Sequence, residues 1–328
     1  MTLSTQLRKK HKIYDTATDL LCLLSLIGIW PRFVESQNFS ISYKKLDMGV
    51  FPKNKPALRV LHLTDLHLNA RVSDRYLRKL QAQVHKCNAD LIVFTGDFLC
   101  YGDCDNWQRL HETLLQWKAP LGVFCVPGNH DYSEYVTLEN GQTKAIIEPQ
   151  PFLYRSIQKL FQIPPDVITT PSHLPITFNS QLRQQLSLLG FRLLENEAQE
   201  INFYNQSFSI LGFEDLWARG QETLKSHAPT LYAGIPKDSL KIVLIHNPQL
   251  WPEIKDLARM QIALSGHTHG GNVALPWIKK RLRNTDTSIP IEGWFQEESN
   301  YLLVSKGMAS PYPFRLFASP QIHLLEIS

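Results

Sequence analysis

The chain has 328 residues, of which 43% are hydrophobic and 20% are charged, and its formal net charge is +4. These values are typical of a globular protein with a substantial core, and they exclude a wholly disordered chain. The modest charge allows an anionic partner but does not favour a nuclease or another nucleic-acid-binding protein. The five cysteines form no CxxC pair, so we expect reduced thiols rather than disulfides or a zinc ribbon.

The N-terminus joins a basic run at residues 8–12 to an apolar stretch, Leu20–Trp30, which Pro31 ends. This stretch is about half of the ~20 residues that span a bilayer. Cations next to an apolar helix favour an interfacial anchor, so we predict that residues 1–36 associate with a membrane. Two alternatives stay open: a helix packed on the body of the protein, and a spanning helix that places the catalytic body outside the cytosol.

Strand and helix patterns alternate from residue 39 onward. We predict strands at 39–43, 58–63, 91–94 and 122–126, with helices at 74–87 and 107–117 among them. Further on we predict a helix at 181–189 and strands at 207–211, 241–245, 262–264, 302–304 and 322–327. Such alternation implies parallel strands, which bind ligands at their carboxyl ends. We therefore predict one α/β catalytic domain over residues 37–328.

Residues 133–178 interrupt this alternation. The segment is rich in proline and aromatic residues and is much longer than an ordinary connection. We interpret it as an inserted lid that lies over the site. Its apolar side chains include Phe152, Leu153, Ile157 and Phe161.

Polar motifs follow the ends of the apolar runs in a fixed order. They are Asp65-Leu66-His67, Gly96-Asp97, Gly128-Asn129-His130-Asp131, His246-Asn247 and Gly266-His267-Thr268-His269. Carboxylates, imidazoles and an amide oxygen suit divalent ions such as Mn²⁺, Fe²⁺ or Zn²⁺. Two such ions ~3.5–4 Å apart would lower the pKa of a shared water and neutralise phosphoryl oxygens. Since no Ser or Cys nucleophile motif is apparent, we predict hydrolysis of a phosphate ester or pyrophosphate by attack of the shared hydroxide.

His130 follows a predicted ligand and is more useful if it binds no metal. It would either protonate the leaving oxygen as a general acid or contact a phosphoryl oxygen. Asp131 would either orient His130 or cap the next turn. We therefore predict a catalytic role for His130 and leave the role of Asp131 open.

The motif order D-x-H, G-D, G-N-H-D/E, H and G-H-x-H resembles the calcineurin-like metallophosphoesterase superfamily, and the match runs from Val60 to His269. The resemblance implies a four-layer α/β/β/α sandwich, here with an N-terminal membrane-associating helix and an inserted lid. It also implies two divalent ions, with Mn²⁺ favoured. Asp65, His67 and His269 would hold one ion, Asn129, His246 and His267 the other, and Asp97 would bridge them.

The N-terminus and residues 30–36, 266–271 and 314–317 resemble a membrane-associated bacterial branch, the UDP-2,3-diacylglucosamine pyrophosphatases of lipid A synthesis. That resemblance implies cleavage of UDP-2,3-diacylglucosamine to UMP and 2,3-diacylglucosamine 1-phosphate. It implies a peripheral or monotopic protein at the cytoplasmic face of the bacterial inner membrane. Its partners would be the glycolipid and the membrane surface, without nucleic acid or an obligate protein partner. For such a substrate, the apolar side chains of the inserted segment would either line an acyl groove or pack the lid onto the body, and the candidates are Phe152, Leu153, Ile157 and Phe161.

Basic side chains near the last motif are candidates to bind the diphosphate or lipid headgroups, and they are Lys279, Lys280, Arg281 and Arg315. The alternatives are a solvated basic helix face and, for Arg315, a salt bridge. Other functions also stay open: a general membrane-associated phosphodiesterase or phosphatase, and an inactive membrane scaffold. Intact metal ligands argue against the scaffold.

Overall fold

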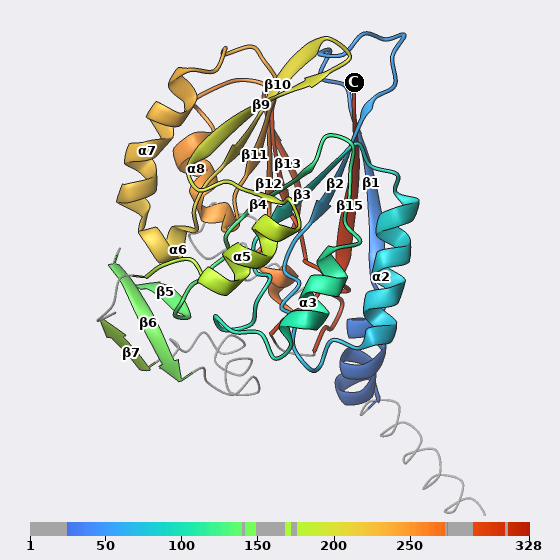
Figure 1. Cartoon of the computed structure of the whole chain (residues 1–328), viewed down its shortest axis with the longest axis vertical. Helices are drawn as coiled ribbons and strands as arrows, with labels where there is room; N and C mark the ends of the chain where they lie inside the picture. The colour runs from blue at the N-terminus through green and yellow to red at the C-terminus, as the bar shows by residue number, and fades with distance from the viewer. Residues whose placement is uncertain are drawn as a thin grey trace, which may run out of the picture.

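Two six-stranded sheets form the centre of this computed structural model, which describes residues 25–139, 142–148, 168–171, 176–272, 274, 291–311 and 314–328 (Figure 1). The first sheet has the order β1 (Ser40–Leu46), β15 (Gln321–Ile327), β2 (Leu58–Leu63), β3 (Leu91–Thr95), β4 (Val123–Val126) and β8 (Arg192–Leu193). The second has the order β13 (Gly293–Glu297), β14 (Asn300–Val304), β12 (Gln261–Ser265), β11 (Lys241–Leu244), β10 (Gln206–Gly212) and β9 (Glu197–Phe203).

Three apolar cores divide the molecule into layers. Helices α2 (Asp74–Lys86), α3 (Trp107–Leu114) and α5 (Ser180–Leu188) pack on the outer face of the first sheet. Helices α7 (Gln221–Ala233) and α8 (Trp251–Ile254) pack on the outer face of the second sheet. The inner faces of the two sheets meet in a core that joins Val60 and Val93 to Ile242 and Leu264. The order is therefore helices, sheet, sheet, helices, as expected for the α/β/β/α sandwich.

The predicted elements agree with the structure to within a few residues. Helix α2 begins after Ser73, whose hydroxyl accepts a hydrogen bond from the amide of Tyr76, and it buries one apolar face. The sequence patterns missed β9 and β13, which are edge strands with mostly polar or half-exposed side chains. They also missed α7, whose helical pattern is weakened by Pro229 in its interior. These three elements thus lie where the apolar pattern of the sequence is weakest.

The carboxyl ends of the central strands meet at one end of the sandwich. Strands β2, β3 and β4 are parallel, and so are β10, β11, β12 and β14. Strand β15 runs antiparallel to β2 and leads to the C-terminus. The carboxyl ends of the parallel strands therefore lie at the opposite end of the molecule from the C-terminus, which is the lower end in Figure 1. This is the end where parallel sheets bind ligands.

The described part of the inserted segment is a small antiparallel sheet of β5 (Val136–Glu139), β6 (Gln142–Glu148) and β7 (Ile168–Pro171) near this lower end (Figure 1). A bridge between Tyr132 and Phe178 closes its base. The hydroxyl of Thr143 donates a hydrogen bond of 2.7 Å to the carbonyl of Trp217 in α6 (Leu216–Arg219). That the segment acts as a lid stays a prediction. Phe152, Leu153, Ile157 and Phe161 lie outside the described residues.

The N-terminal helix η1 (Ser25–Val34), a π-helix, leads through η2 (Glu35–Gln37) into β1. The amide of Arg315 donates a hydrogen bond of 3.1 Å to the carbonyl of Pro31, which holds η1 against the C-terminal loop. In the part of the chain that is described, no helix is both long and apolar enough to cross a bilayer. Membrane association of residues 1–36 stays a prediction.

The cysteines fit the expectation of free thiols. The described ones are all free, namely Cys87, Cys100, Cys104 and Cys125, and Cys22 lies outside the described residues.

Candidate metal centre

The structure brings together all the predicted metal ligands at the carboxyl ends of the parallel strands. Asp65 and His67 follow β2, Asp97 follows β3, and Asn129 follows β4 in the first sheet. His246 follows β11, and His267 and His269 follow β12 in the second sheet. Six of them are buried, and His267 is half-buried. Residues from both sheets therefore form one centre.

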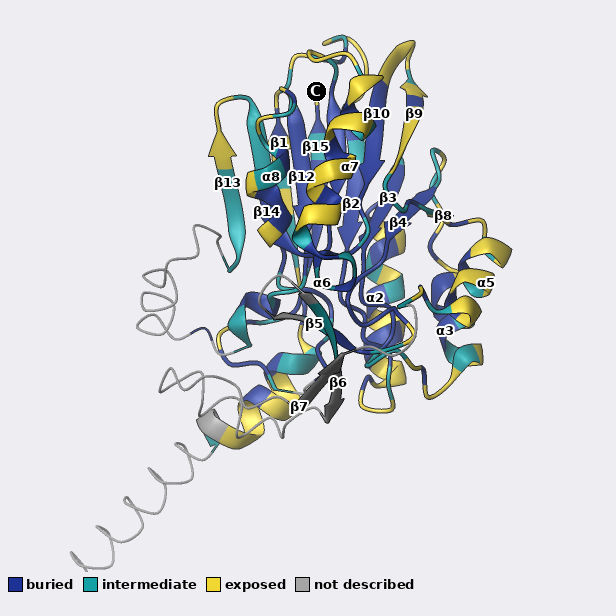
Figure 2. Cartoon of the chain, turned by 90° about the vertical axis from the view of Figure 1, so that its left-hand side faces the viewer, coloured by how far each residue is buried: buried dark blue, intermediate teal, exposed yellow. Residues whose placement is uncertain are grey.

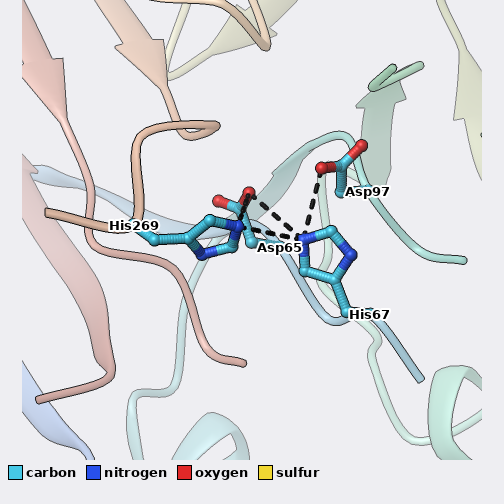
Figure 3. Close-up of side chains that lie close together, drawn as sticks. All are labelled: Asp65, His67, Asp97 and His269. Carbon is cyan, nitrogen blue, oxygen red and sulfur yellow. Dashed lines mark hydrogen bonds and ion pairs between the residues drawn. The ribbon is translucent and has the colours of Figure 1, made fainter. Parts of the chain in front are cut away.

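The first group of ligands is Asp65, His67, Asp97 and His269, whose ligand atoms all lie within 4.8 Å of one another (Figure 3). The Nε2 atom of His67 lies 3.1 Å from Nε2 of His269 and 3.3 Å from Oδ2 of Asp97. The Nε2 atom of His269 lies 3.6 Å from Oδ1 of Asp65. These atoms point to one place from four directions, as Figure 3 shows.

The second group of ligands is Asp97, Asn129, His246 and His267. The Nε2 atom of His246 lies 3.2 Å from Oδ2 of Asp97 and 3.2 Å from Oδ1 of Asn129. The Nδ1 atom of His267 lies 3.0 Å from the same Asn129 oxygen. The same Asp97 oxygen thus faces both groups, which is the position of a bridging carboxylate between two ions.

The backbone of these ligands is left-handed at five positions, which are Asp65, His67, Asp97, His267 and His269. Residues other than glycine rarely adopt a positive φ, because this conformation costs about 1–3 kcal/mol per residue. Such strained positions cluster at functional sites. The turn after each strand directs the ligands inward through this conformation. The strain therefore supports a functional rather than a merely structural role for the centre.

Two glycines allow the ligand loops to approach one another. A Cβ atom on Gly128 would collide with the carboxylate and amide of Asp97, and one on Gly266 would collide with Thr64 and the carboxylate of Asp65. The glycines of the third and fifth motifs are thus required by close packing around the carboxylates.

The orientation of the imidazoles fits metal binding. The Nδ1 atom of His67 lies 3.1 Å from the carbonyl of Leu99, and Nδ1 of His246 lies 2.7 Å from the carbonyl of Thr95. A carbonyl only accepts, so each Nδ1 carries a proton, and Nε2 is the ring atom that faces the carboxylates and would bind a metal ion. Lone pairs and carboxylates that face one another this closely fit divalent cations at both groups.

Electrostatics lead to the same conclusion. Burial would raise the pKa of Asp97, but the neighbouring histidines, His246 foremost, hold it well below its usual value. Burial would lower the pKa of His246, but Asp97 raises it to about 10. The carboxylate is therefore charged at neutral pH and requires nearby positive charge, which a divalent cation supplies in place of a proton.

His130 is buried beside His67, with ring centroids 4.6 Å apart. Its Nδ1 accepts a hydrogen bond of 2.9 Å from the amide of Tyr101, so the proton of the neutral ring is on Nε2. Burial holds the pKa of His130 well below its usual value in spite of Asp97. The geometry favours a neutral donor over an imidazolium acid.

Asp131 caps the loops that carry the ligands. Its carboxylate accepts hydrogen bonds from the amides of Asp97 at 2.7 Å, Gly128 at 3.0 Å and Leu99 at 3.0 Å. Burial, and then the charge of Asp97, raise the pKa of Asp131 to about 7. These amides belong to the ligand loops and not to the turn after Asp131, so the structure gives this carboxylate a role that the sequence did not predict, which is to hold the ligand loops together.

Arg315 does not face a substrate site, which corrects the sequence-based expectation. Its side chain is 1% exposed, and Nη1 donates to the carbonyls of Lys306 at 2.7 Å and His269 at 3.1 Å. Its Nη2 lies 3.2 Å from Nδ1 of His269. Through these hydrogen bonds the guanidinium of Arg315 holds the loop that carries His269. The other basic candidates, Lys279, Lys280 and Arg281, lie outside the described residues.

Three aromatic side chains beside the ligands were missed from the sequence. The ring of Trp217 lies 4.3 Å from that of His267, and the ring of Tyr135 lies 4.3 Å from that of His130. Tyr101 contacts both His130 and Tyr135. One signal was available: Trp217 follows the carboxyl end of β10, another parallel strand of the second sheet.

The comparisons with known proteins agree with this geometry. The family model for calcineurin-like phosphoesterases matches residues 58–271. UDP-2,3-diacylglucosamine pyrophosphatase LpxG of Chlamydia muridarum is 29% identical over 322 residues, which cover 92% of each chain. LpxG of Chlamydia trachomatis is 27% identical over 95% of this chain and 96% of that protein. Phosphodiesterase YaeI of Escherichia coli is 24% identical over 85% of this chain and 86% of that protein.

Proposed function

The chain belongs to the calcineurin-like phosphoesterase family and is a metal-dependent phosphoester hydrolase, and from this premise we propose that it cleaves the pyrophosphate of UDP-2,3-diacylglucosamine. The products would be UMP and 2,3-diacylglucosamine 1-phosphate. The observation that carries the reaction type is the pair of ligand groups that share Oδ2 of Asp97. The substrate is supported by the similarity to two LpxG proteins over more than nine-tenths of the chain.

The mechanism follows from the placement of the side chains. Asp65, His67 and His269 would hold one divalent ion, Asn129, His246 and His267 the other, and Asp97 both. When bound, the ions lower the pKa of water and neutralise phosphoryl oxygens. We propose Mn²⁺ because the donor set mixes nitrogen and oxygen.

His130 donates its Nε2 proton in a hydrogen bond to a phosphoryl oxygen, where charge develops in the transition state. The amide of Tyr101 holds the ring in the required tautomer. The general-acid role considered from the sequence requires the imidazolium, which burial disfavours.

The glycolipid substrate implies a location at the membrane. We propose a peripheral or monotopic protein at the cytoplasmic face of the bacterial inner membrane, held through residues 1–36. The inserted segment 133–178 would receive the acyl chains. Two observations support this role of the segment: its aromatic and apolar composition, and the contact of Tyr135 with His130.

A second candidate is a general membrane-associated phosphodiesterase. The similarity to a protein named phosphodiesterase YaeI favours it, because the same metal ligands serve any phosphodiester. Turnover of small soluble diesters in preference to the glycolipid would support this candidate.

The proposal is tested by incubating purified protein with UDP-2,3-diacylglucosamine and Mn²⁺ in detergent and measuring UMP and the lipid 1-phosphate by mass spectrometry. We expect both products from the wild type and neither from Asp97→Asn. Hydrolysis of bis(p-nitrophenyl) phosphate without either product would refute this substrate and leave the hydrolase assignment intact.

A further inference from the structure

Two histidines lie in the core between the sheets and are not among the candidate metal ligands. His62 of β2 and His323 of β15 are cross-strand partners, are at most 3% exposed, and stack with their ring centroids 5.8 Å apart. Val60 and Leu325, two residues away on the same strands, belong to the core between the sheets, so both imidazoles point into it. We name His62 and His323 the imidazole pair.

Packing alone is a poor explanation for the imidazole pair. Burial lowers the pKa of His62 to about 3 and holds the pKa of His323 well below its usual value, so both rings are neutral. Among the described residues, Nδ1 of each ring has no hydrogen-bond partner. A buried imidazole that uses only one of its nitrogens stabilises a core less than an aliphatic side chain of similar size. The contacts of the two Nε2 atoms therefore require explanation.

The Nε2 atom of His62 leads to the second group of metal ligands. It lies 2.8 Å from Oγ1 of Thr95, the last residue of β3. The carbonyl of Thr95 in turn accepts a hydrogen bond of 2.7 Å from Nδ1 of His246. A carbonyl in this place orients the ring of a metal ligand and fixes its tautomer. His62 thus holds the residue that orients His246, and the route crosses from the first sheet to the second.

The Nε2 atom of His323 leads to the first group of metal ligands. It lies 3.0 Å from Oγ of Ser305, which also accepts a hydrogen bond of 3.1 Å from the amide of Gly307. Gly307 packs on Asp65 so closely that a Cβ atom would lie 2.6 Å from Cβ of Asp65. The amide of Ala309 then donates a hydrogen bond of 2.7 Å to the carbonyl of Asp65. His323 thus holds the loop that fixes Asp65, and this route also joins the two sheets.

We propose that His62 and His323 are positioning residues, which fix one group of metal ligands each through the hydroxyls of Thr95 and Ser305. The pair holds the two sheets in register directly beneath the centre, so the ligands keep their positions before any ion binds. The proposal rests on the two-ion centre of the proposed function but not on its substrate.

The test is isothermal titration calorimetry of the full-length protein with Mn²⁺. His62→Leu removes the hydrogen bond to Thr95, and Thr95→Val removes the same bond from the other side while it keeps the carbonyl. We expect each variant to bind Mn²⁺ about 10–100-fold more weakly than the wild type. The double variant should bind no more weakly than the weaker of the two single variants, because both changes remove one interaction. His62→Gln should recover most of the affinity, since its amide offers a polar atom at a similar reach.

The control is Gln261→Leu, which removes another fully buried polar side chain. Gln261 begins β12, whereas His267 and His269 follow the opposite end of that strand. Its Nε2 donates hydrogen bonds to the carbonyls of Lys255 and Ala258. We expect the control to unfold at lower urea in EDTA and to keep its Mn²⁺ affinity. His62→Leu should show the reverse, with weaker binding and no loss of stability in EDTA, because leucine suits the apolar core.

The corresponding variants on the other route are His323→Leu and Ser305→Ala, for which we expect the same relation between single and double variants. Unchanged Mn²⁺ affinity in His62→Leu overturns the proposal, and so do losses that multiply in the double variant. If His62→Leu does not fold, unchanged affinity in Thr95→Val overturns it. Tight Mn²⁺ binding by a wild type that leaves UDP-2,3-diacylglucosamine intact would refute the proposed substrate and leave the positioning role in place.

Discussion

The metal centre and the exposed apolar side chains of η1, which are Ile29, Trp30, Phe33 and Val34, lie at the same end of the molecule but are built in opposite ways (Figure 2). The metal centre buries charge: Asp65 and Asp97 are at most 1% exposed, and the backbone at both is left-handed. Helix η1 exposes hydrocarbon, and it is held on the body by the buried carboxylate of Glu35 and by the hydrogen bond from the amide of Arg315 to the carbonyl of Pro31. The comparison teaches that burial and strain hold the candidate metal ligands in place, whereas the exposed apolar side chains belong to the segment that we propose meets the membrane.

The first prediction concerns Asp97, because it joins the two ligand groups. Asp97→Asn removes the charge that both groups share, so we expect kcat for a soluble diester to fall about 10³-fold or more. Steady-state kinetics with bis(p-nitrophenyl) phosphate measure this loss, and circular dichroism verifies folding. A decrease in kcat of less than about tenfold would show that catalysis does not depend on a metal bridge through Asp97.

The second prediction concerns the role of His130. His130→Ala should lower kcat about 10²–10³-fold, the effect of removing one donor to a developing charge. His130→Gln should recover part of this loss, since an amide N–H donates at a similar reach but cannot act as a general acid. Equal activity of the two variants, with loss of the alkaline limb of the pH profile, would instead identify a general acid.

The third prediction concerns Arg315, which links the two regions. Arg315→Lys cannot reproduce the fork of hydrogen bonds behind His269, so we expect Mn²⁺ affinity to fall about 10–100-fold. Isothermal titration calorimetry measures the affinity. Arg183→Lys is the matched control, because that arginine pairs with Glu195 at the surface. Unchanged affinity in Arg315→Lys would remove the proposed link.

The fourth and smallest effect concerns Asp215, a buried carboxylate near the second ligand group. Burial, followed by the charge of Asp97, raises its pKa to about 6, and in the described part of the chain its Oδ2 has no hydrogen-bond partner. Because the folded state binds this proton more tightly, the contribution of Asp215 to stability is lost as pH rises from about 4 to 6.

Asp215→Asn keeps the Oδ1 atom that caps Trp217 and Ala218, and it cannot ionise. In EDTA, we expect the variant to exceed the wild type in stability at pH 7 by about 2 kcal/mol or less, and to match it near pH 4. Urea unfolding at several pH values measures the difference. A difference that is the same at pH 4 and pH 7 would contradict the assigned pKa.

The sequence was sufficient to predict the ligand positions because each ligand directly follows a strand with a strong apolar pattern. Asp65, Asp97 and His246 required no knowledge of the turns. The contacts of Trp217 and Tyr135 could not be predicted in this way, because ring packing depends on how separate loops meet in three dimensions. Arg315 was misread for the same reason: its charge suggested a substrate anion, whereas the fold surrounds it with carbonyls.

Helix η1 shows a different limit of the sequence. The apolar residues of η1 predicted either membrane association or packing on the body, and the described part of the helix does pack on the body through Pro31 and Glu35. Which of its side chains stay exposed depends on contacts between the two ends of the chain, such as the hydrogen bond from the amide of Phe317 to the carboxylate of Glu35. No local pattern encodes such contacts.

The most direct test of the central claim is the number of divalent ions that each chain binds. After loading with Mn²⁺ and removal of free metal, elemental analysis should find two ions per chain in the wild type and fewer in Asp97→Asn. One ion per fully active wild-type chain, or an unchanged count in Asp97→Asn, would contradict a centre in which Asp97 joins two metal sites.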